Sequence, residues 1–201
     1  MKTEKPKLII IAGPNGSGKT SVTGKILEHH WIDGCFYINP DNIAQNEFGD
    51  WNSQEAIYKA ANKAKDLRED LINKKEGILF ETVFSAEEKL TFLKHSKESG
   101  YFIRLFFVGT NHPAINASRI AHRVLEGGHD VPITKIISRF SKSIVNCGIA
   151  ASLVDRLYVY DNSEDFAEPK LLFKASHGIL TKEYNAINPW ALSIYDSLRK
   201  K

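Results

Sequence analysis

The segment from residue 13 to residue 20 combines glycines, a lysine and a threonine at a spacing that suits phosphate chemistry. Its residues are, in order, Gly13, Pro14, Asn15, Gly16, Ser17, Gly18, Lys19 and Thr20. They match the pattern G-x-x-x-x-G-K-[ST] at every fixed position. Glycines let backbone N–H groups turn toward an anion, and a helix that follows adds partial positive charge at its N-terminus. The spacing therefore predicts a site for the phosphates of a nucleoside triphosphate.

Two side chains of this segment have separate expected roles. The Lys19 ammonium would reach the β- and γ-phosphates, and the Thr20 hydroxyl would ligate Mg²⁺. We expect ATP and Mg²⁺ as ligands, with GTP as the alternative nucleotide. An ordinary glycine-rich turn is the competing interpretation. A strand-like run before the segment (7–12) and a helix-like run after it (21–27) argue against that turn.

Acidic residues follow or end several of the expected strands. Asp41 comes after the strand at 36–39 and suits two roles, a general base for an attacking hydroxyl and the N-cap of a helix. Glu81 lies in an otherwise apolar strand, where an unpaired charge is costly, which favours a role at the water shell of Mg²⁺ or at a substrate hydroxyl. Asp161 begins an Asp-Asn-Ser sequence that is typical of a turn. Asn162 is the candidate for a contact with the nucleotide base.

Two amphipathic helices are expected around Gly127-Gly128, between residues 116 and 146. Their apolar stripes are formed by Ala117, Ile120, Ala121 and Val124 in the first helix and by Ile133, Ile136, Ile137, Phe140 and Ile144 in the second. Their basic residues lie opposite and are Arg119, Arg123, Lys135, Arg139 and Lys142. A solvated basic face is the plain interpretation of each residue, whereas the set suits the clamping of phosphates. His129 either caps the hinge between the helices or touches substrate.

Strand-like and helix-like runs alternate along the chain. Strands are expected at 7–12, 36–39, 78–84, 101–108 and 156–160, with helices between them. This order predicts an α/β fold in three layers, a P-loop NTPase or kinase-like architecture with a mostly parallel five-stranded sheet. We expect one domain over 1–201, in which the helices at about 111–150 form a lid and a hairpin and helix occupy about 169–201.

Composition limits the partners and the cellular compartment that we expect for the protein. The 201 residues carry a net charge of +3, which is too mild to indicate a nucleic acid or a membrane as partner. The two cysteines, Cys35 and Cys147, favour a reducing compartment over a disulfide framework. The apolar run before Gly13 is too short for a signal peptide or a membrane span. We therefore expect a cytoplasmic protein.

Several of these segments together resemble the zeta-toxin-like family of small P-loop kinases. The similarity includes the loop at 13–20, Asn39-Pro40-Asp41, Phe80-Glu81-Thr82 and the segment from Arg119 to Pro132 with its Gly-Gly-His-Asp-Val-Pro sequence. It extends through Ile136 to Phe140 and through Tyr160 to Ser163. The chain looks like a shorter, stand-alone branch of that family, described as predicted ATPases. Val83 stands where many relatives carry a second threonine.

The resemblance implies an ATP- or GTP-dependent kinase that phosphorylates a hydroxyl of a small molecule, and well-known members use UDP-N-acetylglucosamine. It implies Asp41 as the general base, Lys19 and Thr20 as contacts of ATP and Mg²⁺, and Arg119 and Arg123 as lid arginines that stabilise the transferred charge. It also marks candidate substrate contacts, which are Glu81, Thr82, His129 and Arg139. The resemblance also implies, as a hypothesis, an antitoxin as a partner protein.

Two other functions stay open at this point. A polynucleotide or RNA-end kinase would use the basic helix faces for backbone phosphates, but few aromatic residues accompany them for stacking. A nucleotide-gated interaction module would bind ATP without turnover. Each predicts a different response to an added acceptor.

Overall fold

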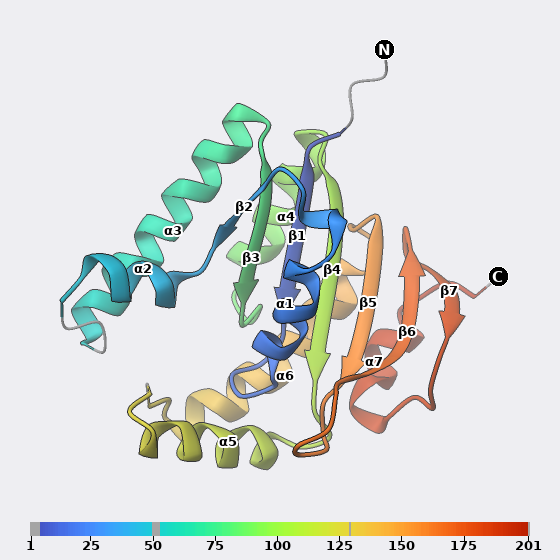
Figure 1. Ribbon diagram of the computed structural model, residues 1–201. Helices are drawn as coiled ribbons and strands as arrows, with labels where there is room; N and C mark the ends of the chain where they lie inside the picture. Colours follow the sequence, from blue (N-terminus) through green and yellow to red (C-terminus); the bar gives the residue numbers. More distant parts are fainter. Residues whose placement is uncertain (1–4, 50–52, 129, 201) are drawn as a thin grey trace.

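The structure, a computed structural model, describes residues 5–49, 53–128 and 130–200. Its central element is a seven-stranded sheet in the order β2-β3-β1-β4-β5-β6-β7 (Figure 1). The strands are β1 (Lys7–Ala12), β2 (Cys35–Ile38), β3 (Gly77–Thr82), β4 (Phe102–Gly109), β5 (Arg156–Asp161), β6 (Lys170–Ser176) and β7 (Ile179–Glu183). The first five strands of the order pair in parallel. This arrangement confirms the expected α/β fold with a mostly parallel sheet.

The number of strands differs from the five that the sequence predicts. The C-terminal hairpin joins the sheet, because β6 pairs antiparallel with β5, where Leu157 lies opposite Ala175. The hairpin turns at His177 and Gly178, whose φ angles of 51° and 72° are both positive. Two positive φ angles in a two-residue loop match the twist of paired strands. The sheet therefore has seven strands, five parallel and two antiparallel.

Helices cover both faces of this sheet, giving three layers (Figure 1). The helices are α1 (Lys19–Leu27), α2 (Pro40–Glu47), α3 (Gln54–Lys74), α4 (Glu88–Glu98), α5 (Pro113–Leu125), α6 (Ile133–Ala150) and α7 (Leu192–Asp196), with short 3-10 turns at His30–Ile32 and Pro189–Ala191. On one face α1 packs Val22 and Ile26 against Ile9 and Ile11 of β1. On the other face α3, α4 and α6 pack against the residues of β1, β3, β4 and β5 that alternate with these. Alternate side chains of a strand point to opposite faces, so each strand supplies both layers.

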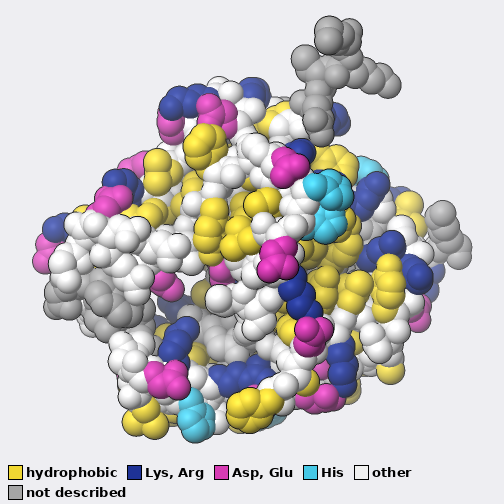
Figure 2. Space-filling view, viewed as in Figure 1, with side chains coloured by type: hydrophobic (Ala, Val, Ile, Leu, Met, Phe, Trp, Pro, Cys, Tyr) yellow, Lys and Arg dark blue, Asp and Glu magenta, His cyan; other side chains and the backbone are white. Residues whose placement is uncertain are grey.

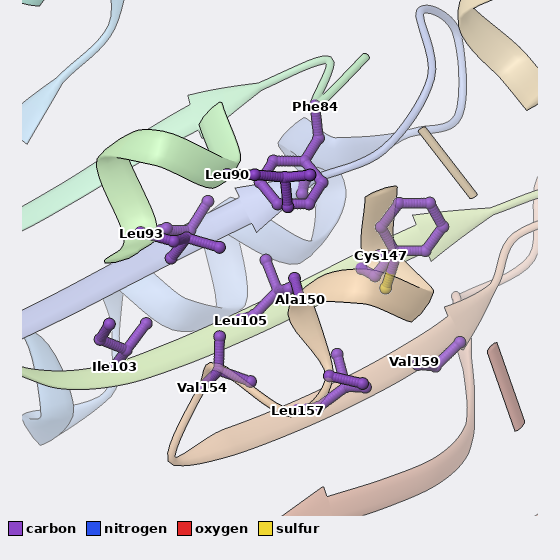
Figure 3. Packing of buried hydrophobic residues seen from close by; sticks show 14 of the residues in the cluster. Phe84, Leu90, Leu93, Ile103, Leu105, Cys147, Ala150, Val154, Leu157 and Val159 are labelled. Atoms are coloured by element: carbon purple, nitrogen blue, oxygen red, sulfur yellow. The ribbon is translucent and has the colours of Figure 1, made fainter. Parts of the chain in front are cut away.

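The larger core lies between α4, α6 and the sheet (Figure 3). Leu93 of α4 and Cys147 of α6 are both fully buried there against Leu105 of β4. In α6 the buried residues follow helical spacing through Ile136, Phe140, Ser143, Ile144, Cys147 and Ala150. The C-terminal half of this helix is therefore part of the core.

The apolar stripe predicted for α6 is wrong at two positions. Ile133 is 66% exposed and Ile137 is 52% exposed, whereas Ile136, Phe140 and Ile144 are buried as expected. The helix docks on the sheet only from Ile136 onward, and Ile137 is rotated about 100° from its buried neighbour. The first turn of α6 therefore stays on the surface.

Helix α5 lies across the carboxyl ends of the central strands, directly after β4 (Figure 1). Together with the first turns of α6 it forms the part of the predicted lid region that lies near this edge of the sheet. Ligands of open α/β sheets bind at this edge. Within the described ranges, every helix is too short or too polar to cross a membrane.

Candidate active site

The glycine-rich loop connects β1 to α1 at the carboxyl edge of the sheet. Gly16 and Gly18 have φ angles of 74° and 86°, in the left-handed region that favours glycine. A Cβ at Gly16 would lie 2.5 Å from the carbonyl oxygen of Asn116, and one at Gly18 would lie 2.0 Å from Nδ2 of Asn162. Both positions therefore require glycine on grounds of conformation and of space.

The N-terminus of α1 is open to an anion. Its cap residue is Gly18, which provides no side-chain acceptor, and its first turn contains no acidic residue. The first N–H groups of a helix have no partners inside the helix, and the helix dipole favours negative charge there. Beside them the hydroxyl of Ser17 is fully buried and has no hydrogen-bond partner in the described part of the chain. This set of donors fits phosphate oxygens.

Lys19 lies in the centre of the loop. Its ammonium donates to the carbonyl oxygens of Gly13 and Pro14 at 3.0 and 2.9 Å. Desolvation by the surrounding loop lowers the pKa of Lys19 to about 8. The carboxylates of Glu81 and Asp41 oppose that shift, and the guanidinium of Arg123 adds to it. Charged side chains from β3, α2 and α5 therefore lie close enough to act on the charge of one ammonium group.

Glu81 is held by a chain of hydrogen bonds at the carboxyl ends of β2 and β3. The Tyr37 hydroxyl donates to Oε1 of Glu81 at 2.9 Å, and Nδ2 of Asn39 donates to the Tyr37 oxygen at 3.0 Å. Burial, followed by the charge of Glu81, raises the pKa of Tyr37 to about 12. Tyr37 is therefore a hydrogen-bond donor throughout the neutral range.

The same chain of bonds shows that Asp41 is not the N-cap of α2. Oδ1 of Asn39 accepts a hydrogen bond from the backbone N–H of Asp41 at 2.9 Å, so Asn39 is the N-cap of α2. Pro40 occupies the first helical position, where its missing N–H costs nothing. The side chain of Asp41 is exposed and is not used as the cap. It is available for chemistry beside Lys19.

The two lid arginines have different surroundings. Arg119 donates to Oδ1 of Asp165 at 2.8 Å, to the carbonyl of Asn162 at 2.8 Å and to the carbonyl of Glu164 at 3.3 Å. Arg123 is exposed, and no ion pair joins it to a carboxylate in the described part of the chain. Its charge acts on Lys19. Arg123 therefore lies at the site of the loop, whereas Arg119 is tied to the segment after β5.

The remaining predicted substrate contacts are distributed around this centre. Arg139 of α6 donates to Oδ1 of Asn15 at 3.2 Å, so a basic residue of the second helix does meet the loop. The hydroxyl of Thr82 accepts the backbone N–H of Phe84 at 3.3 Å. His129 lies outside the described residues. Thr20 is exposed at the start of α1.

Two asparagines that the sequence does not single out as supports hold the loop in place. Nδ2 of Asn116 donates to the carbonyl of Asn15 at 2.6 Å, and its Oδ1 accepts the hydroxyl of Thr110. Nδ2 of Asn162 donates to the carbonyl of Ser17 at 2.9 Å, so this amide is occupied by the loop instead of a nucleotide base. Both asparagines are more than 100 residues along the chain from the loop residues that they bind. Sequence spacing gives no signal for such contacts.

Asp161 has the structural role that the turn sequence predicts. Its carboxylate accepts the hydroxyl of Ser163 at 2.7 Å and the indole N–H of Trp190 at 2.8 Å. Within the described ranges no three His, Cys, Asp or Glu side chains are grouped as a metal site. A cation at this loop would therefore depend on the Thr20 hydroxyl and on phosphate oxygens.

The surface is hollowed where these residues meet. Figure 2 shows a depression between the lobe of α2 and α3 and the rim formed by α5, with Lys and Arg side chains along its lower edge. A cavity of about 260 Å³ lies under α2 and includes Tyr37, Asn39, Asn42, Asn46 and Glu47 in its lining. Its lining contains no Lys or Arg and one carboxylate, that of Glu47, so it suits polar groups without negative charge.

The layered α/β fold and the loop at the carboxyl edge of the sheet define the class of P-loop kinase-like proteins. The family model "Zeta toxin" matches residues 1–167. The chain belongs to the zeta toxin family.

The chain is also similar to a curated protein and to solved structures. An uncharacterized protein of Haemophilus influenzae (strain ATCC 51907 / DSM 11121 / KW20 / Rd) is 32% identical over 123 residues, which are 61% of this chain and 84% of that protein. The crystal structure of AvrRxo1-ORF1:-ORF2 with ATP has a TM-score of 0.68 at 18% identity, over 96% of this chain and 63% of that chain. The PezAT chromosomal toxin-antitoxin system of Streptococcus pneumoniae has a TM-score of 0.62 at 16% identity, over 98% and 80%.

These likenesses to solved structures concern the fold. This chain spans less than two thirds of the AvrRxo1 chain that it resembles.

Proposed function

We propose that this protein binds ATP and transfers its γ-phosphoryl group to a hydroxyl of a small molecule. The observation that carries the proposal is the open N-terminus of α1 with the unpartnered hydroxyl of Ser17 and the ammonium of Lys19 beside it. The charges of Glu81, Asp41 and Arg123 act on that ammonium. Phosphoryl transfer needs positive charge on the moving group and a carboxylate at the attacking hydroxyl, and it needs little other chemistry from the protein. Membership of the zeta toxin family and the ATP in the AvrRxo1 structure support the choice of nucleotide.

The residues divide the work as follows. The loop and the N-terminus of α1 bind the phosphates, and Lys19 exchanges the carbonyls of Gly13 and Pro14 for phosphate oxygens. Asp41 accepts the proton of the acceptor hydroxyl. At the same time the oxygen of that hydroxyl bonds to the γ-phosphorus, and the bond between the γ-phosphorus and the oxygen of ADP breaks. Arg123 and Lys19 stabilise the charge on the transferred group.

Mg²⁺ fits this arrangement through the hydroxyl of Thr20. Because Mg²⁺ usually keeps several waters and binds through substrate phosphates, it does not need a cluster of protein ligands. When bound, the ion would neutralise charge on the β- and γ-phosphates. The protein contributes the position of Thr20 at the first turn of α1.

The acceptor is proposed to be a nucleotide sugar such as UDP-N-acetylglucosamine, by resemblance to the family. The cavity under α2 suits the uncharged sugar of such an acceptor, because carboxamides and a phenol line it. With no Lys or Arg and with the carboxylate of Glu47 in its lining, it does not suit the diphosphate. It shares Tyr37 and Asn39 with the hydrogen-bond chain that leads to Glu81. A hydroxyl of an acceptor in this cavity would lie beside Tyr37 and Asn39, and Asn39 caps the helix that carries Asp41.

The test is mass spectrometry of UDP-N-acetylglucosamine after incubation with the protein and Mg-ATP. We expect a gain of one phosphate with the wild type and with Asp66→Asn, a matched control at an exposed aspartate of α3 away from the cavity. We expect a loss on the order of 10²–10⁴-fold with Asp41→Asn, together with retained ATP binding.

The other outcomes of this test separate the parts of the proposal. A wild-type rate in Asp41→Asn would remove Asp41 as the base. Consumption of ATP without a modified nucleotide sugar would redirect the search to other acceptors, including RNA ends. ATP binding without turnover by any acceptor would favour a nucleotide-gated module.

A partner protein is a further part of this proposal. The PezAT structure belongs to a toxin-antitoxin system, and an antitoxin that covers the loop would keep such a kinase inactive. Co-expression with the neighbouring open reading frames, followed by affinity purification and assay, tests this idea. A purified chain that is harmless on expression and has no co-purifying partner would contradict it.

A further inference from the structure

A second cavity lies away from the phosphate loop, between α3 and α4. It has a volume of about 290 Å³, and its lining includes Arg68, Phe92 and the stems of Lys65 and Lys89. The ring of Phe80, which neighbours Arg68, belongs to the core on the α4 and α6 side of the sheet. The phosphate loop leads into α1 on the opposite face. The two sites are therefore separated by the sheet.

Arg68 is the unusual residue of this cavity. It is only 6% exposed, and its guanidinium lies 4.9 Å from the ring centroid of Phe80 and 5.8 Å from that of Phe92. No hydrogen bond or ion pair joins it to another residue in the described ranges. A guanidinium has five N–H donors, and burial without acceptors is costly. No nitrogen of Arg68 is among the described side-chain atoms that are both buried and unpaired, so its donors are open to the cavity that it lines.

The acidic residues nearby do not satisfy this charge. Glu88 accepts a hydrogen bond from Lys89 at 3.4 Å, and Glu69 lies 3.6 Å from the ring of His95. Both carboxylates act on Arg68 only at longer range. The lining holds three Lys or Arg side chains and two Glu side chains. The two carboxylates of the lining therefore pair with Lys89 and His95 of the same wall, and neither forms an ion pair with Arg68.

The shape and chemistry of the lining indicate what would fill it. A carboxylate accepts two parallel hydrogen bonds from a guanidinium fork. The ring of Phe92 and the alkyl stems of the lysines offer an apolar wall for the remainder of such a molecule. We infer that this cavity is a second ligand site, which binds a small organic carboxylate with an apolar body through the guanidinium of Arg68. The inference does not depend on the kinase proposal.

The unpaired charge of Arg68 leads to a prediction about the thermal stability of the protein, which can be tested without the natural ligand. Methionine is long and unbranched and packs well on aromatic rings, so Arg68→Met keeps the contacts with Phe80 and Phe92 and removes the unpaired charge. We expect the ligand-free variant to melt at the same temperature as the wild type or above it. The control is Arg156→Met. Arg156 also lies over a phenylalanine ring but donates to Ser176 at 2.6 Å and to a backbone carbonyl at 2.8 Å, so its loss should lower the melting temperature.

The binding experiment uses benzoate as the probe and the Lys19→Ala chain as the background, so that the phosphate loop does not respond. The Nε–H signal of Arg68, identified by its absence in Arg68→Met, is followed by NMR at constant ionic strength. We expect a saturable shift with benzoate and none with an equal concentration of sodium chloride.

Three results would overturn the inference. One is the absence of a saturable benzoate shift. Another is a shift with inorganic phosphate but not with benzoate, which would exclude the carboxylate class. The third is a loss of melting temperature in Arg68→Met as large as in Arg156→Met, which would make Arg68 a structural residue.

Discussion

The side-chain amide of Asn162 donates a 2.9 Å hydrogen bond to the backbone carbonyl of Ser17, across 145 residues of sequence. Asn162 follows β5 directly, and Ser17 precedes Gly18, the N-cap of α1. The carbonyl of Asn162 accepts the guanidinium of Arg119 at 2.8 Å. One residue therefore connects the phosphate loop, the end of β5 and helix α5.

Replacement of Asn162 by alanine should loosen the loop. The lost hydrogen bond is worth about 1 kcal/mol, and if that cost falls on the bound loop the Kd for ATP rises about fivefold. Isothermal titration with Mg-ATP measures the change. Asn188→Ala is the control, because Asn188 makes a comparable bond to Asn111 at an exposed position. Equal affinities of Asn162→Ala and the wild type would contradict the supporting role.

ATP affinity should depend on pH through Lys19. Its pKa is lowered from 10.5 to about 8, so the ammonium is charged below pH 8 and is lost as the pH rises through that value. Phosphates favour the charged form, so binding takes up a proton above pH 8 and affinity falls by up to about tenfold per pH unit. Fluorescence titration with an ATP analogue between pH 7 and pH 10 checks this slope.

The matched control for this titration is Lys19→Arg. A guanidinium stays charged throughout this range, so its pH profile should be flat even if its affinity is lower. The same slope in both proteins would assign the pH dependence to another group.

Substitutions of the two lid arginines should affect different properties of the protein. Arg123→Gln removes a charge that acts on Lys19 and has no ion pair of its own, so we expect a loss of transfer rate on the order of 10³-fold with little change in melting temperature. Arg119→Gln breaks three contacts with the segment at 162–165 and should lower melting temperature and ATP affinity together. Single-turnover rates and thermal melts of both variants measure this. The reverse pattern would exchange the two roles.

Tyr37→Phe should affect transfer more than nucleotide binding. The variant keeps the ring and removes the donor to Glu81 and the acceptor for Asn39. A lost hydrogen bond to a charged group is worth about 1.5–3 kcal/mol, which corresponds to a rate loss of roughly 10- to 150-fold. Steady-state kinetics with ATP and acceptor varied separately test this. Tyr58→Phe, at an exposed position of α3, is the control.

Local patterns predicted much of this fold. The spacing of residues 13–20 and the apolar runs of five strands are local properties, and the family model and the parallel strand pairs agree with them. The pairing of β6 with β5 was missed, because a hairpin carries no local signal of the strand beside which it will lie. The exposure of Ile133 and Ile137 was missed because helical periodicity does not fix the rotation of a helix on the sheet.

The charged residues of the candidate site could be proposed from the sequence. The residues that hold the loop and cap the helix beside it could not. Lys19, Asp41, Glu81 and Arg123 stand out by type and position, and in the structure the charges of the other three act on Lys19. The choice between Asp41 and Asn39 as helix cap could not be made from sequence, because both residue types favour that position. The long-range bonds of Asn162 likewise required the folded chain.

The hairpin of β6 and β7 also determines how the sheet ends. Without it β5, a six-residue strand with alternate buried side chains, would be a free edge with unpaired N–H and C=O groups to which another chain could add a strand. The hairpin pairs with that edge, and the backbone of Arg199 bonds in turn to Leu180 of β7. The opposite edge is β2, with four residues. The hairpin, which lies beyond the family match at residue 167, therefore moves this edge of the sheet from β5 to β7.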